Sequence, residues 1–173
     1  METSRLDRQL AIINSGNHEE IMALIKNEAL CEKSEVVLIK RGDASEIKYY
    51  IDNDNLYEKA QIALIERGNS AEIKFYIKKH RSISDNAEVA LVKRGKTSEI
   101  KLYIKITFFC DEAELLLIKR GNHDEIMLYI SRHNLSDLVQ AALLIRGHKD
   151  EIHHYNINNG FSDELQKLLI FFQ

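Results

Sequence analysis

The chain of 173 residues is long enough for one ordinary domain or for a short repeat array. Its formal net charge of −3 gives no strong overall attraction to nucleic acid or to a membrane surface. No apolar stretch reaches the roughly 18 residues that a membrane span needs, and the polar N-terminus does not resemble a secretory signal. Only two cysteines are present, which suits a reducing compartment. We therefore expect a folded, cytoplasmic protein with no membrane segment.

A glycine recurs every 26 or 27 residues and divides the sequence into similar copies. Five of these glycines follow an arginine, whereas the first follows a serine. The six glycines are Gly16, Gly42, Gly68, Gly95, Gly121 and Gly147. A fixed period of this length is the signature of a repeat array. The absence of proline favours helices, because proline breaks helix interiors.

In chain order, the sequence predicts a leading helix over about residues 4–15 and then six helix pairs. The first helix of each pair, helix A, starts directly after the glycine. Four copies place a good N-cap there, and a glutamate three residues later is expected to complete a capping box. These caps are Asn17, Asp43, Asn69 and Asn122. Lys96 and His148 hold the same position in the other two copies, where we expect a weaker cap.

Helix A carries one apolar stripe, for example Ile73, Tyr76 and Ile77, so it is predicted to keep a solvated face. The second helix, helix B, contains four consecutive apolar residues, such as those at 89–92. We expect helix B to be sandwiched between its neighbours, because it is apolar on nearly every side. The next glycine is expected to end helix B in the left-handed conformation.

The predicted fold is an all-α, right-handed α-solenoid of about six two-helix repeats of 26–27 residues, plus one leading helix. It is expected to form a single domain over residues 1–173, in which the outermost copies are atypical. The capping helix covers 1–15, and the repeats cover about 16–41, 42–67, 68–94, 95–120, 121–146 and 147–173. At the C-terminal end, Phe171 and Phe172 are expected either to close the core or to form an interface.

The repeated Arg-Gly-Asn-x-x-Glu-Ile pattern resembles the α-solenoid superfamily, which includes HEAT, armadillo and leucine-rich-repeat-variant arrays. HEAT and armadillo repeats are longer, at about 40–47 residues. The resemblance implies a curved scaffold that binds proteins or peptides and, in some members, nucleic acid. It implies no particular functional residues, because the binding residues of solenoids differ between proteins.

Two ladders of repeated side chains have both a functional and a structural interpretation. From Gly42 onward, an arginine precedes each recurring glycine and a tyrosine stands eight residues after that glycine. The arginines could bind phosphate or carboxylate groups, and the tyrosines could stack on nucleobases. A residue that every copy requires is expected to serve the copy itself. We therefore predict that the arginines cap helices and pair with the nearby glutamates. The tyrosine rings are predicted to be buried, with each hydroxyl at an edge of the core.

The candidate contact residues are the variable ones on helix A and in the loop after it. Two positions of helix A are basic in the middle copies, and their side chains form either a solvated face or a ridge for an acidic partner. These lysines are Lys48, Lys74, Lys78, Lys101 and Lys105. Ile106 and Phe108 stand where other copies have polar or small residues. They predict either an exposed apolar patch or a loop that folds over them.

We expect a non-catalytic scaffold that binds a protein or peptide partner, including an acidic one, along one face of the array. The alternative is a nucleic-acid-binding, HEAT-like solenoid that uses the basic ridge, and the near-neutral charge argues against it. No catalytic motif or cofactor fingerprint is present, so no enzyme activity and no cofactor are expected. His148, His153 and His154 lack a metal-ligand spacing, so no metal is expected. The choice between monomer and dimer stays open.

Overall fold

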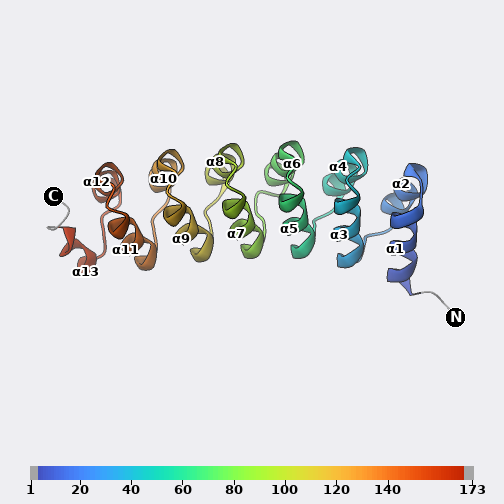
Figure 1. Ribbon diagram of the computed structural model, residues 1–173, viewed down its shortest axis with the longest axis horizontal. Coiled ribbons are helices and arrows are strands. Elements are labelled where there is room, and N and C mark those ends of the chain that lie inside the picture. The colour runs from blue at the N-terminus through green and yellow to red at the C-terminus, as the bar shows by residue number, and fades with distance from the viewer. Residues whose placement is uncertain (1–3, 170–173) are drawn as a thin grey trace. The chain divides into compact units, whose positions relative to one another are not determined.

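The computed structural model describes residues 4–169, which form thirteen helices and no strand (Figure 1). The leading helix is α1 (Arg5–Ser15). The A helices are α2 (His18–Asn27), α4 (Ala44–Asn53), α6 (Ser70–His80), α8 (Thr97–Ile106), α10 (His123–Ile130) and α12 (Lys149–Asn158). The B helices are α3 (Glu32–Arg41), α5 (Glu58–Arg67), α7 (Asp85–Arg94), α9 (Asp111–Arg120), α11 (Asp137–Arg146) and α13 (Asp163–Gln166). This confirms the leading helix and the alternation of A and B helices.

The chain forms two compact units, Met1–Ala90 and Leu91–Gln173, and the boundary falls inside α7. In the first unit, α3 packs between α1 and α5, and α4 packs between α2 and α6. In the second unit, α9 packs beside α11, and α10 packs between α8 and α12. Each unit therefore has one layer of A helices and one layer of B helices. The single domain over residues 1–173 stays a prediction.

The glycines end the B helices as predicted. Gly42, Gly68, Gly95, Gly121 and Gly147 have φ angles between 71° and 90°, in the left-handed region. Gly16 differs, since its φ of −72° is extended backbone. The regular stop is therefore a feature of the copies that carry the Arg-Gly dipeptide.

The N-caps of the A helices follow the sequence, but the capping box mostly does not form. Asn17, Asp43, Asn69 and Asn122 all accept backbone N–H bonds, whereas Lys96 and His148 make no side-chain cap. Within residues 4–169, only the pair Asn17 and Glu20 forms the reciprocal box. The corresponding glutamates of the later copies are buried and face an arginine. The expected box is wrong there, because the ion pair takes the carboxylate.

Helix B is sandwiched between its neighbours as predicted, for example α3 between α1 and α5. The two layers are buried to a similar degree, however, so the expectation that only helix A keeps a solvated face is wrong. In α3 the buried side chains are Ser34, Glu35, Leu38 and Ile39, and in α4 they are Glu46, Ile47, Tyr50 and Ile51. Each helix of a two-layer array contacts its partner on one side and its neighbours on two others. The fourth side faces solvent, and every B helix from α3 to α11 is exposed there.

No helix within residues 4–169 is long and apolar enough to cross a bilayer. Phe171 and Phe172, which were expected to close the core or form an interface, lie outside the described residues.

Candidate functional site

Arginines of the ladder join their repeat to the one before it. Arg67 donates from Nη1 to the buried Glu72 at 2.6 Å and from Nη2 to the Gly42 carbonyl, one repeat earlier, at 2.6 Å. Arg146 does the same, with Glu151 at 2.8 Å from Nε and the Gly121 carbonyl at 2.9 Å from Nη2. This confirms the predicted pairing with glutamate. The carbonyl that each guanidinium caps belongs to the preceding repeat, which the sequence did not suggest.

The tyrosine ladder makes a second link in the same direction. The Tyr50 hydroxyl accepts the Leu30 N–H at 3.2 Å and donates to the Glu35 carboxylate at 2.8 Å, and both partners belong to the preceding repeat. Tyr129 and Tyr155 accept the corresponding N–H groups of the loops before them. The rings are buried as predicted. The hydroxyls are also buried and bonded, and do not lie at an edge of the core.

Replacing Tyr50 by phenylalanine is expected to lower the free energy of unfolding by about 1–3 kcal/mol. The change leaves the buried Leu30 N–H without its acceptor and the Glu35 carboxylate without one donor, and orphaned buried polar groups cost about this much. Urea denaturation of both proteins measures the difference. Tyr49→Phe is the matched control, since Tyr49 is half-buried and its ring faces Lys26. An equal loss in both variants would contradict the link.

A third link uses a polar residue that the sequence analysis missed. Seven residues before each glycine, in the middle of helix B, stands a glutamine or a glutamate: Gln9, Glu35, Gln61, Glu88, Glu114 and Gln140. Gln9 accepts the Cys31 N–H at 2.9 Å and donates to the Ala29 carbonyl at 3.1 Å. Glu35 accepts the Tyr57 N–H at 2.8 Å. The signal was available, because a glutamine or glutamate stands directly before the run of apolar residues in each of these helices.

Burial changes the acidity of the glutamates at this position. It raises the pKa of Glu35 to about 7, although the Tyr57 N–H and the Tyr50 hydroxyl favour the charged form. Burial also raises the pKa of Glu114, against hydrogen bonds from Tyr129 and Ser136. These carboxyls sit between repeats, so their titration acts on the stability of the array.

The predicted lysine ridge is only partly free in the first unit. Lys48 and Lys78 are exposed, and Lys74 is half-buried. The Nζ atom of Lys48 lies 5.8 Å from the centroid of the Phe75 ring, one repeat later. A shallow hollow of about 260 Å³ between α4 and α6 is lined by Lys48, Ile51 and Phe75 among others. A cation over an aromatic ring is a stabilising contact in its own right. The ridge stays a prediction.

The second unit contains the other two lysines, and one of them is paired. Lys101 Nζ lies 3.0 Å from Asp124 Oδ2, on the next A helix, whereas Lys105 is exposed. Solvent screens this pair at the surface, so a partner could displace it.

The two apolar residues at the end of α8 differ in exposure. Ile106 is half-buried, but 68% of Phe108 is exposed to solvent. The next residue, Phe109, is buried, with its ring centroid 5.0 Å from Tyr103 and 5.7 Å from Tyr129. The loop therefore anchors itself with Phe109 and leaves Phe108 in solvent.

Phe108 lines a cavity of about 470 Å³ between the α8–α9 and α10–α11 connections. We call it the loop cavity. Its apolar wall includes Phe109 and Leu135, and its polar lining includes Asp111 and Arg132. Arg132 is exposed. This arrangement can enclose an apolar side chain and place a guanidinium beside a carboxylate.

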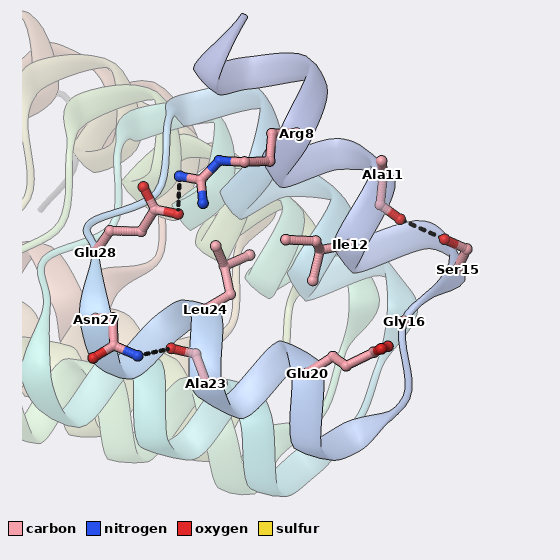
Figure 2. Close-up of a pocket in the computed structure, with 10 residues that line it drawn as sticks. All are labelled: Arg8, Ala11, Ile12, Ser15, Gly16, Glu20, Ala23, Leu24, Asn27 and Glu28. Atoms are coloured by element: carbon pink, nitrogen blue, oxygen red, sulfur yellow. Dashed lines mark hydrogen bonds and ion pairs between the residues drawn. The ribbon is translucent and has the colours of Figure 1, made fainter. Parts of the chain in front are cut away.

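The first repeat lacks the links toward a preceding repeat. Ser15 stands in place of the arginine and Leu24 in place of the tyrosine. An ion pair between Arg8 and Glu28 joins α1 to the end of α2 instead (Figure 2). Ser15 donates to the Ala11 carbonyl at 2.7 Å, and Asn27 donates to Ala23 at 2.7 Å. A hollow of about 540 Å³ remains between the two helices, as Figure 2 shows.

The structure groups the histidines differently from the sequence. His123 and His148 stack with ring centroids 4.6 Å apart, and His123 Nδ1 lies 2.9 Å from Glu151 Oε1. His153 and His154 take no part in this group. Arg146 already binds the Glu151 carboxylate, so the group acts as a further polar contact between repeats.

Comparison with known proteins adds no relative from which a function could be transferred. No family model matches the chain, and neither a curated protein nor a solved structure matches it. What the sequence predicts and the structure confirms is a helical repeat, in which short helices pack in adjacent pairs. We therefore infer the function from the exposed side chains that depart from the repeat.

Proposed function

We propose that the protein is a non-catalytic scaffold of the α-solenoid superfamily, which binds a protein or peptide partner at the loop cavity. The observation that carries this proposal is the exposed Phe108 side chain beside that cavity. Asn55 and Asn134 hold the same position in other repeats and are also exposed. Phenylalanine therefore gains nothing from folding at this position. It would gain about 2 kcal/mol or more by burial against a partner.

Two exposed side chains of the loop cavity support a peptide partner that combines an apolar side chain with an acidic one. Phe108 offers the apolar surface, since Phe109 and Leu135 are buried. Arg132 offers an exposed guanidinium, and such groups bind carboxylates in a bidentate manner. The exposed Lys105, on the helix that leads into the loop, adds positive charge.

The fate of the repeated polar residues supports a non-catalytic role. Arg67, Glu72 and Tyr50 are all used in links between repeats, as described above. Each recurs in most copies, which is expected of a structural part and unusual for a catalytic group. The proposal places the protein in the cytoplasm, where free thiols such as those of Cys31 and Cys110 stay reduced.

A peptide selection on the immobilised full chain tests the proposal. Selected peptides are expected to carry an apolar residue near an acidic one, and to lose at least about tenfold in affinity for Phe108→Asn. Asparagine is the residue of two other repeats at this position, so the variant should fold normally. The matched control is Ile157→Asn on α12, which replaces a side chain that is 66% exposed. Affinity for the control should change by less than about twofold.

Peptides that bind both variants equally would overturn the loop cavity as the site. A mobility-shift assay with single- and double-stranded nucleic acid at low salt covers the alternative partner. Binding that falls steeply with salt and is lost in Lys74→Glu/Lys78→Glu would replace the protein partner by nucleic acid.

A further inference from the structure

The B helix α11 differs from α1, α3, α5, α7 and α9 at two exposed positions. These positions lie nine and two residues before the glycine and are exposed in each copy from α1 to α11. Five copies place polar or charged residues there: Asp7 and Asn14, Lys33 and Lys40, Lys59 and Glu66, Asn86 and Lys93, Glu112 and Lys119. In α11 the same two positions hold Leu138 and Ile145.

Both side chains stand in solvent and share one face of α11. Leu138 is 64% exposed and Ile145 is 84% exposed. They are seven residues apart, which is two helical turns, and Ala141 and Ala142 lie between them on the same face. Both alanines are half-buried. We call these four residues the α11 stripe. It has the i, i+3, i+4, i+7 spacing of a helix face that packs against another helix.

We propose that the α11 stripe pairs with the α11 stripe of a second copy of this chain, about a two-fold axis that makes the two helices antiparallel. This face is distinct from the loop cavity, and the inference does not depend on the proposed partner. The stripe is self-complementary in that arrangement. Leu138 of one copy meets Ile145 of the other at both ends, and the small alanines at the centre let the two helices approach closely.

The charges beside the stripe favour the same arrangement. Helix α9 packs next to α11 and carries Glu112 and Lys119 at the two equivalent positions. Both are exposed. When α11 pairs antiparallel with its copy about such an axis, α9 faces α9 of the second copy, also antiparallel. Glu112 of each copy then lies opposite Lys119 of the other. A parallel pairing would not bring these two charges together, so the charge pattern selects the antiparallel dimer.

The α11 stripe is a small surface, which limits the area that the dimer can bury. A helix of ten residues is about 15 Å long, and a stable interface buries roughly 800 Å² per partner. The α11 stripe alone is smaller than that, so α9 must contribute to the contact. Contacts at the low end of interface size are typical of weak association, so we expect a dissociation constant in the micromolar range.

Sedimentation of the full chain over a range of concentrations tests the proposal. The wild type is expected to change from monomer to dimer as the concentration rises through the micromolar range. Ile145→Lys is expected to raise the dissociation constant at least about tenfold. Lysine stands at this position in α3, α7 and α9, so the variant should fold like the wild type, which circular dichroism checks. Ile157→Lys, on α12, is the control and should leave the dimer unchanged.

A charge exchange tests the orientation. Glu112→Lys places two lysines opposite each other and should weaken the dimer, whereas Glu112→Lys/Lys119→Glu should restore it. A wild type that stays monomeric up to about 100 µM, or a dimer that Ile145→Lys leaves intact, would overturn the proposal. A dimer that is weakened by Ile145→Lys and not restored by the exchange would overturn the antiparallel arrangement.

Discussion

Arg67→Ala is expected to lower the free energy of unfolding by about 3 kcal/mol or more. The change leaves the Glu72 carboxylate, which is only 6% exposed, without its cation, and removes the donor to the Gly42 carbonyl. Breaking a buried ion pair from one side costs about 3–5 kcal/mol, because an uncompensated charge remains inside. Urea denaturation followed by circular dichroism measures the loss.

The pair itself is expected to contribute little net stability, and a double replacement shows this. Burial raises the pKa of Glu72 even though Arg67 lies beside it, so desolvation outweighs the attraction of the guanidinium. Arg67→Met/Glu72→Leu should therefore regain most of the stability that Arg67→Ala loses. Glu66→Ala, at the adjacent exposed position, is the control and should change stability by less than about 0.5 kcal/mol. A double variant as unstable as the single one would contradict this account.

The elements of this fold were predictable because their signals are local. A cap such as Asn69, the glutamate after it and the glycine before it lie within a few residues of each other, so the sequence alone locates each helix. The regular period then repeats the same information six times. The capping box failed in the later copies, where an arginine pairs with the glutamate. The assignment of a solvated face to helix A alone also failed. It used the apolar content of helix B and ignored that a single stack leaves one side of every helix open.

Most links between repeats were not predictable in the same way, because their partners are 15 to 29 residues apart. Tyr50 meets Leu30, and His80 meets the Ile51 carbonyl, only after the repeats have stacked. The pairing of Lys101 with Asp124 was missed for the same reason, because the two residues are 23 positions apart. This ion pair reduces the free charge of the predicted ridge.

The α11 stripe shows a different kind of omission. Its signal was in the sequence, since Ile145 replaces residues such as Lys119 at an aligned position. It passed unnoticed because an apolar residue in helix B was expected to be buried. The structure shows that the B helices have an exposed face and that Ile145 lies on it. Ile145 is therefore a candidate interface residue and not part of the core.

Glu35→Gln is expected to stabilise the protein at neutral pH and to have a smaller effect in acid. The pKa of Glu35 is about 7 in the folded chain, against 4.5 for an ordinary glutamate. The folded state therefore binds more protons than the unfolded state between these values, and stability falls as the pH rises through this window. The loss is complete above about pH 7 and amounts to about 3 kcal/mol for a shift of this size.

Glutamine removes this loss because it cannot ionise, and the chain already contains the arrangement that it would adopt. Gln61, at the same position of the next repeat, accepts the Ser84 N–H at 2.7 Å and donates to the Leu56 carbonyl at 2.8 Å. The test compares the unfolding free energies of wild type and Glu35→Gln between pH 4 and pH 8. The contributions of all other carboxyls are the same in both proteins and cancel in the difference. The reverse change, Gln61→Glu, is the matched control and should make stability fall more steeply across the same range. A stability difference between Glu35→Gln and wild type that does not grow with pH would contradict this prediction. It would mean that Glu35 ionises at its ordinary pKa. Its hydrogen bonds from Tyr50 and Tyr57 would then outweigh the cost of burying its charge.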